Sequence, residues 1–481
     1  MEEFQPSWWL IATYLLLMFG IGIWAARTRV GRMEDMAVAG RSSGPWLIAF
    51  SVAATWINGT TLIGISGVAK DFGLSAYWTG GSFVLATIWM SYYVVPRLRA
   101  TRIITVPQLF ERFYGPRHRL VSLSLIILRD LGATAGVMGS LAVVTSSILQ
   151  ISLLQSLALV GALTLVYVFL GGMWAILVTD AIQFFIVSIG SVALVVFGFL
   201  GAGGFSVLRS IEDPDFLGSF GTGGPSQVIA WVIIGISITF GYQSVIQRGL
   251  AASSTAAAHK GFLYGGIIST IWYMVPPLIG VLGRALYGTD ISGDDVFLRM
   301  TFGVAGGQLG SIIIVGILAA SMSTLDSTIN TIASNFTIDI YNRFLNPNAS
   351  PRAQLWLYRL NVILVGALAA AIYYVFPLMI ELFWLGGRIM GASVAPVVAA
   401  MVLFPRVRRA PRTVLTSMLT GASVIILYQV LGSVQEVGTI VVVWTIDPIL
   451  IGVPITVSLL ALGTWWETRD ARPIRPDSSK P

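Results

Sequence analysis

Long apolar runs separated by short polar connections dominate the chain. A run of about 20 apolar residues is long enough to cross a bilayer as a helix, and longer runs require tilt or partial burial. Thirteen such runs can be distinguished: 7–26, 45–69, 76–95, 121–149, 153–170, 174–200, 228–247, 262–285, 304–339, 355–378, 380–404, 413–433 and 447–466. The pattern predicts an all-α polytopic membrane protein.

The run at 45–69 differs from the others because Asn58, Gly59, Thr60 and Thr61 lie at its centre. A helix with such a centre should interrupt its own hydrogen bonds, and free carbonyls are tolerated in lipid only where they line a cavity or bind a ligand. We interpret this run as a binding site for an ion and a small solute. The alternative is that small polar residues only allow close helix packing.

A second interrupted run, at 228–247, contains Gly, Ser and Thr and follows the first by five spans. Two broken segments at matching positions in successive five-helix units are typical of inverted-repeat transporters.

Composition excludes several classes of protein. Only 11% of the 481 residues are charged, whereas soluble domains contain about 25%. The chain has no cysteine, so disulfides and Cys-ligated metals are excluded, and its two histidines lie in short basic loops. It has no GxxxxGK[ST] phosphate loop, which argues against a nucleotide-driven pump. No nucleophile–base or metal-ligand pattern occurs in the spans, so we do not expect an enzyme.

The distribution of charge predicts the orientation in the membrane. Glu2 and Glu3 precede the first span and Arg27 follows it, which is not the pattern of a signal peptide. Arginines cluster at 97–119 and 406–412 and in the tail, whereas the alternate loops are acidic. Basic residues concentrate in cytoplasmic loops, so the +7 net charge reports topology rather than nucleic-acid binding. We expect a multi-pass protein of the bacterial or archaeal inner membrane, with the N-terminus outside and the C-terminus in the cytoplasm. We expect it to be a monomer.

Charged side chains within the spans need a reason, because each costs roughly 2.5–3.5 kcal/mol at mid-bilayer. Asp180 and Asp326 are the main candidates, and Asp326 lies in a hydroxyl-rich run, residues 321–328. Hydroxyls spaced by three or four residues share one helix face and could serve a hard cation such as sodium, although back-bonding to the preceding turn is the alternative. Arg129 and Asp130 are candidates for a structural pair.

Three motifs resemble the sodium:solute symporter family: residues 171–183 (GGMWAILVTDAIQ), 247–252 (QRGLAA) and 323–341 (from STLDS to FTIDIY). The resemblance implies a LeuT-type core with one extra N-terminal helix and two extra C-terminal helices. Its segments would be 1–44, a first repeat at 45–227, a second repeat at 228–412, and 413–481.

The resemblance also implies the ion site. The sodium ligands would be the carbonyls or hydroxyls of five residues: Ala54, Ile57, Ala320, Ser323 and Thr324. Asp180 matches a family aspartate associated with sodium coupling, and we group Asp326 with it. Sodium would be the only cofactor, and transport would proceed by alternating access.

The solute is predicted from local likeness. The sequence around Trp56, Tyr242 and Arg248 is similar to the high-affinity choline transporters, which implies an aromatic cage for a quaternary ammonium, although only small residues lie near Ala133. The expected solute-side residues are Trp56, Thr60, Thr61, Phe83 and Tyr242; Thr60 and Thr61 disfavour a sugar. The alternatives are sodium- or proton-coupled uptake of a proline-like amino acid or a small monocarboxylate, a transporter-like sensor, or a channel.

Overall fold

The computed structural model describes residues 7–204, 211, 213–304, 307–377, 379–435 and 447–469. Over these residues the chain is almost entirely helical, and its only strand pairing is an isolated bridge between Ser43 and Ala252. The helices are α1 (Trp8–Thr28), α2 (Met33–Val38), α3 (Pro45–Trp56), α4 (Gly59–Phe72), α5 (Tyr77–Tyr93), α6 (Val95–Ala100), α7 (Val106–Tyr114), α8 (Pro116–Leu149), α9 (Leu153–Gly201), α10 (Gly224–Thr239), α11 (Gln243–Ala251), α12 (Thr255–Trp272), α13 (Val275–Tyr287), α14 (Gly293–Val304), α15 (Gly307–Asn335), α16 (Pro351–Val375), α17 (Met379–Ala392), α18 (Val394–Leu403), α19 (Pro411–Gln435) and α20 (Ile449–Thr468).

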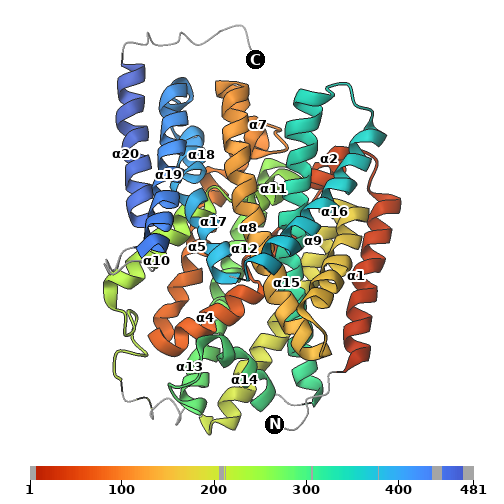
Figure 1. Ribbon diagram of the computed structural model, residues 1–481, viewed down its shortest axis with the longest axis vertical. Coiled ribbons are helices and arrows are strands. Elements are labelled where there is room, and N and C mark those ends of the chain that lie inside the picture. Colours follow the sequence, from red (N-terminus) through yellow and green to blue (C-terminus); the bar gives the residue numbers. More distant parts are fainter. Residues whose placement is uncertain are drawn as a thin grey trace.

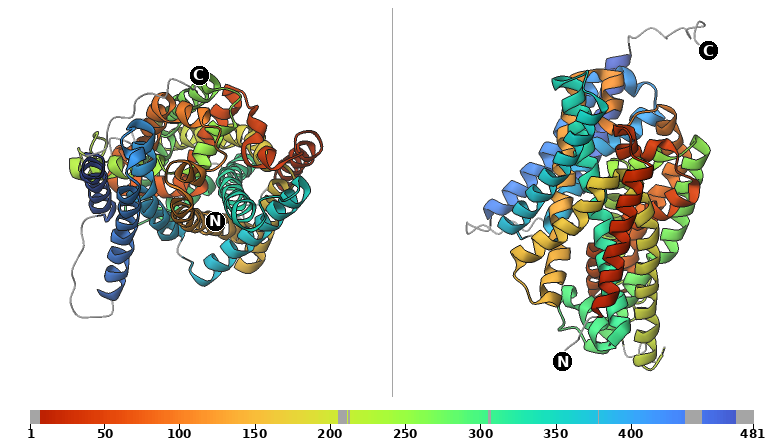
Figure 2. Two further views of the ribbon diagram at one scale, coloured as in Figure 1. Left: turned by 90° about the horizontal axis from the view of Figure 1, so that it is seen from above. Right: turned by 90° about the vertical axis from the view of Figure 1, so that its right-hand side faces the viewer.

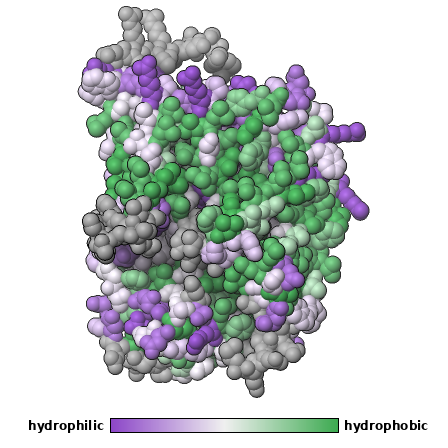
Figure 3. All heavy atoms as spheres, viewed as in Figure 1, coloured by the Kyte–Doolittle hydropathy of each residue, from purple (hydrophilic) through white to green (hydrophobic). Residues whose placement is uncertain are grey.

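The helices form one bundle with an apolar belt. Figure 1 shows most long helices running along the same axis, and Figure 2 shows the bundle from above and from the side. Hydrophobic side chains cover the middle of the visible surface, and hydrophilic ones gather towards its two ends (Figure 3). This distribution is that of a protein whose middle lies in lipid.

The predicted count of thirteen spans is not confirmed. In the described part of the chain, nine helices are long and apolar enough to cross a membrane, or up to eleven if each bent pair forms one span. One reason is that the predicted spans 153–170 and 174–200 both fall within α9, which runs for 49 residues. Its backbone turns at Gly172 (φ 49°, ψ −139°), between the two predicted spans. A side chain is disfavoured at that φ, so glycine allows the turn.

Helix α15 is the central element of the bundle. In the apolar 18-residue stretch of this helix, 94% of the residues are buried, compared with 28% in the corresponding stretches of α1, α16 and α20. Past Asn335 the helix continues as a π-helical segment, Phe336–Leu345. The hydroxyl-rich run at 321–328 therefore lies in the protein interior, away from lipid.

Two membrane helices are broken, as the sequence predicts. Between α3 and α4, the backbone of Ile57 and Asn58 is extended. Between α10 and α11, the break ends at Tyr242 (φ −71°, ψ 96°), and the two helices are bent by 51° relative to each other. The first break is stabilised locally, because the Asn58 side chain accepts a 2.9 Å hydrogen bond from the Thr61 backbone N–H, and the Thr61 hydroxyl accepts one from the Asn58 N–H. This reciprocal cap starts α4 and explains why the polar centre ends α3.

A charged cluster joins α7, α8 and the π-helical segment. Arg119 donates to Asp339 at 2.8 Å and pairs with Glu111, which also accepts a 2.6 Å bond from Arg343. Burial alone would raise the pKa of Glu111, but the hydrogen bonds from Arg343 and Arg119 outweigh it and lower the pKa below its ordinary value. Glu111 is therefore ionised at neutral pH.

Candidate ion and solute site

The end of α3 meets the middle of α15 at the first helix break. The Ser323 hydroxyl donates to the Ala54 carbonyl at 3.2 Å and to the Ala320 carbonyl at 2.9 Å. One residue further along each helix, the Thr324 hydroxyl lies 3.5 Å from the Thr55 carbonyl oxygen. These side chains are buried. Residues 269 positions apart in the chain thus place hydroxyl and carbonyl oxygens together.

Four of the five predicted sodium ligands make direct contacts in this region, and the fifth, Ile57, donates its N–H to the Ala54 carbonyl at 3.2 Å. Neutral oxygen donors of this kind suit a hard cation. The described residues contain no cluster of three or more His, Cys, Asp or Glu side chains that could hold a metal, so these oxygens form a different kind of site from a carboxylate cage. Back-bonding also occurs, since Ser327 and Thr328 donate to carbonyls one turn earlier.

Asp180 belongs to a buried ion pair beside these oxygens. Its Oδ2 accepts a 2.7 Å bond from Arg248 and a bond from the Ser51 hydroxyl. Arg248 is fully buried and also donates to the Ser327 hydroxyl at 2.7 Å and the Ser244 carbonyl at 2.7 Å. The pair therefore links α9, α11, α3 and α15. The role of Arg248 was missed by the sequence analysis, although its motif contained the residue.

Asp326 is held by neutral donors. The Tyr167 hydroxyl donates to its Oδ2 at 2.8 Å, and the Ser327 hydroxyl donates to its Oδ1 at 2.9 Å. Ser327 contacts both Asp326 and Arg248, so the two predicted coupling aspartates belong to one polar network. A network of this kind ties the position of α11 to that of α15.

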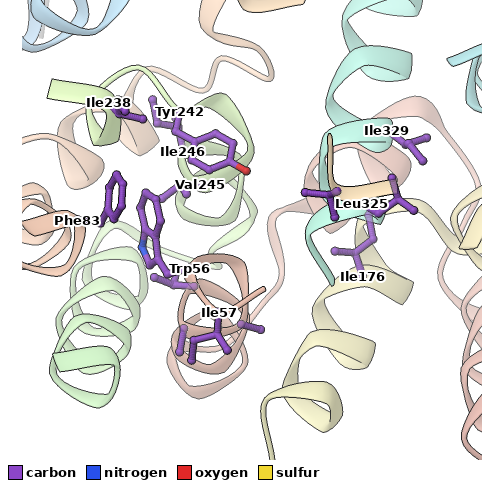
Figure 4. Close-up of a cluster of buried hydrophobic side chains, with 14 of the residues drawn as sticks. Trp56, Ile57, Phe83, Ile176, Ile238, Tyr242, Val245, Ile246, Leu325 and Ile329 are labelled. Carbon is purple, nitrogen blue, oxygen red and sulfur yellow. The ribbon is translucent and has the colours of Figure 1, made fainter. Parts of the chain in front are cut away.

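A cavity of about 280 Å³ lies next to the break, between α4, α5, α10 and α17. It is lined by four of the residues expected on the solute side: Trp56, Thr61, Phe83 and Tyr242. Trp56 stacks on Phe83 with ring centroids 5.1 Å apart, and Tyr242 meets Trp56 edge-on at 5.6 Å. Figure 4 shows these three rings close together, on the opposite side of the view from Leu325 and Ile329. The side chain of Thr60 lies outside the part of the chain that the structure describes.

Arg129 also lines this cavity, which the sequence analysis did not predict. Its guanidinium carbon lies 3.6 Å from the centre of the Tyr242 ring, and its Nη1 donates to Asp130 at 2.6 Å, so the expected pair with Asp130 forms. Within the described residues, three donor atoms on side chains that line the cavity are buried and have no hydrogen-bond partner: Arg129 Nε, Trp56 Nε1 and the Tyr242 hydroxyl. Buried donors without partners are costly, so this wall of the cavity is suited to a ligand with acceptor oxygens.

A second ion pair lies at the cavity. Arg388 on α17 binds Asp447 through two nitrogens, at 3.0 and 2.7 Å, and both side chains remain partly exposed. Asp447 also caps α20 by accepting the Ile449 N–H at 3.0 Å. The ion pair with Asp447 explains the presence of a charged residue at position 388, which the sequence alone did not explain.

The fold and site have the features of a secondary transporter: broken helices, a buried polar network between them, and an adjoining cavity. A profile of the sodium:solute symporter family matches residues 37–435. The chain belongs to this family and is a sodium-coupled solute symporter in a multi-pass membrane fold.

Individual relatives differ in their solutes. The chain is 27% identical to the sodium/proline symporter of Haemophilus influenzae, over 88% of each chain. It is 23% identical to the high-affinity choline transporter 1 of Caenorhabditis elegans, over 82% of this chain and 73% of the relative. Among solved structures, it resembles the substrate-bound outward-open state of a Na⁺-coupled sialic acid symporter, with a TM-score of 0.78, 19% identity, and coverage of 95% and 97%. This likeness supports the LeuT-type fold.

Proposed function

We propose that the solute of this symporter is a small molecule with a carboxylate group, bound in the cavity beside Trp56. The observation that carries the proposal is Arg129, which lines the cavity with a buried and unpartnered Nε. A guanidinium offers several N–H donors in a fixed fork that matches a carboxylate. The nearby Tyr242 hydroxyl can donate to the same group.

The same observation disfavours the quaternary ammonium expected from the aromatic residues. A cation–π site needs an open ring face, and the Arg129 guanidinium already lies against Tyr242 at 3.6 Å. The aromatic pair of Trp56 and Phe83 then serves as an apolar surface for the body of the solute.

Membrane potential distinguishes the two carboxylate classes that the sequence leaves open. A tenfold sodium gradient supplies about 1.4 kcal/mol, and 100 mV adds about 2.3 kcal/mol per net charge. With one sodium ion, a zwitterionic amino acid could be accumulated roughly 500-fold, whereas a monocarboxylate moves with no net charge and reaches only about tenfold. The relatives named as sodium/proline symporters favour the zwitterion.

For the ion, we propose that sodium is held by the carbonyls of Ala54, Ile57 and Ala320 and the hydroxyls of Ser323 and Thr324. A hydroxyl can rotate its hydrogen away and present a lone pair to a cation. Sodium would then hold α3 against α15, and its release would free the two helices to separate. This gives alternating access a physical basis, because the state with α3 and α15 together gains the ion's binding energy.

Asp180 and Asp326 would couple this ion site to α11. Arg248 lies on the half-helix that follows the second break and is bound to both Asp180 and Ser327. Moving α11 breaks these bonds, so a change at the sodium oxygens is transmitted to the second broken helix. We further propose the inverted repeats at 45–227 and 228–412, an external N-terminus and a monomeric unit.

The test uses purified protein and a thermal-shift screen of proline, betaine, choline, short-chain acids and a sugar, each with sodium and with potassium. We expect stabilisation by a carboxylate solute in sodium, and its loss in Arg129→Gln. The matched control is Arg359→Gln, since Arg359 is a half-buried arginine on α16 that does not line the cavity. Stabilisation by choline that persists in Arg129→Gln would overturn the carboxylate proposal. Solute binding without accumulation in vesicles would favour a sensor, and accumulation above equilibrium excludes a channel.

A further inference from the structure

A second, larger cavity lies between α18 and α20 and shares no lining residue with the solute cavity. Its volume is about 1030 Å³, and it lies where α18 ends and the 405–409 turn begins. The lining is mostly apolar and includes Ala399, Leu403, Val457, Leu460 and Ala461. Figure 1 shows these helices at the edge of the bundle, towards the end that carries the C-terminus, where lipid would surround them.

One end of this groove is basic. Arg406, Arg409 and Arg469 all belong to its lining. Arg406 and Arg409 are exposed, and neither has an acidic partner among the described residues. Neighbouring Arg408 differs, because it donates to the Met401 and Val402 carbonyls and so serves the turn itself. The side chains of the two exposed arginines thus place positive charge at the groove that no carboxylate of the described residues neutralises.

The groove also has a polar atom in its wall. Thr464 is buried, lines the groove, and its hydroxyl has no partner in the described part of the chain. On the same helix, Trp465 lines the groove, and the neighbouring Trp466 stacks against the Arg469 guanidinium at 3.7 Å. Tryptophan and arginine together mark the level of lipid headgroups.

We propose that this groove binds an anionic phospholipid of the leaflet on the C-terminal side. Its phosphate would lie between the arginines, and an acyl chain would lie along the apolar wall between α18 and α20. Basic pockets between membrane helices on the cytoplasmic side suit such headgroups, and each arginine near the surface contributes on the order of fivefold in binding.

Another apolar cavity of the protein provides a contrast. It has a volume of about 350 Å³ and is lined by residues of α1, α8, α9 and α15, including Trp8, Leu141 and Leu163, with no charged residue. A cavity of that kind accepts acyl chains from any lipid. Unlike this cavity, the α18–α20 groove combines apolar length with a basic end, so it should select lipids by charge.

The first test measures retained lipids by native mass spectrometry after purification from phosphatidylglycerol and phosphatidylcholine mixtures. We expect preferential retention of phosphatidylglycerol, reduced roughly 30-fold in affinity by Arg406→Gln/Arg409→Gln. The matched control is Arg27→Gln/Arg352→Gln, which removes two other exposed arginines, at α1 and α16. Equal retention by the groove variant and the control would overturn the proposal.

A second variant tests the acyl-chain part and keeps every arginine. Ala461→Trp fills the groove from an exposed position on α20. We expect it to lower phosphatidylglycerol retention while the sodium-dependent thermal shift stays unchanged, which shows that the protein is folded. Undiminished retention in Ala461→Trp would show that the lipid does not occupy the groove and would refute the assignment.

Discussion

Replacing Thr324 by valine tests the proposed sodium site with little change in volume. The Thr324 hydroxyl is buried and lies 3.5 Å from the Thr55 carbonyl, a distance at the limit of a hydrogen bond. The fold therefore gains little from this hydroxyl when no ion is bound. A contact between a hydroxyl and a charge is worth about 1.5–3 kcal/mol, so Thr324→Val should weaken sodium binding by about 10- to 150-fold.

The control for this substitution is one turn further along the same helix. The Thr328 hydroxyl is equally buried, but it donates only within α15, to the Thr324 and Leu325 carbonyls at 3.1 Å. Thr328→Val therefore makes the same chemical change without removing a proposed ligand. Sodium titrations of solute uptake and of the thermal midpoint give the half-saturating concentration for both variants. Equal shifts in the two variants, or no shift in Thr324→Val, would refute the reasoning.

Three further predictions test the ion pairs of the protein. Asp180→Asn should destabilise the protein by about 3–5 kcal/mol and stop transport, because Arg248 loses its buried partner. The double variant Asp180→Leu/Arg248→Leu should recover stability in unfolding assays without recovering transport. Glu111→Gln should lower the thermal midpoint at pH 7. Because the fold lowers the pKa of Glu111, the extra stability of the wild-type protein is present above the ordinary pKa of glutamate and is lost as the pH falls from there through the lowered pKa. A pH series of thermal midpoints for both proteins measures this loss. Arg388→Gln should change stability by less than about 1 kcal/mol, since the pair of Arg388 with Asp447 is partly exposed. Because both residues line the cavity, its loss should speed solute dissociation in stopped-flow measurements, and an unchanged rate would show that the pair does not restrict solute exit.

The local features of the fold could be predicted from the sequence. The break at Ile57 and Asn58 follows from side chains three residues apart, Asn58 and Thr61, which cap each other. Interactions between residues this close in the chain can be predicted without any knowledge of the tertiary structure. The meeting of Ala54 with Ser323 is not local, and it was reached through resemblance to a family rather than from the residues themselves.

The residues that sequence reasoning missed are those whose partners are distant or whose helix face was unknown. Arg248 finds Asp180 across 68 residues, and no spacing rule connects them. Arg129 was read as a partner of its neighbour Asp130, which is correct, but its position at the cavity depends on the rotation of α8. A membrane helix has weak polar periodicity to indicate that rotation, since its outer face contacts lipid.

The most direct measurement of the central claim is solute uptake into proteoliposomes across an imposed sodium gradient, with radiolabelled proline and a labelled short-chain acid supplied in turn. The account predicts accumulation of a carboxylate solute above equilibrium that requires sodium and is lost in Arg129→Gln. The rise in thermal midpoint that sodium alone causes should be retained in that variant. Uptake that only equilibrates, or accumulation that Arg129→Gln leaves unchanged, would contradict it.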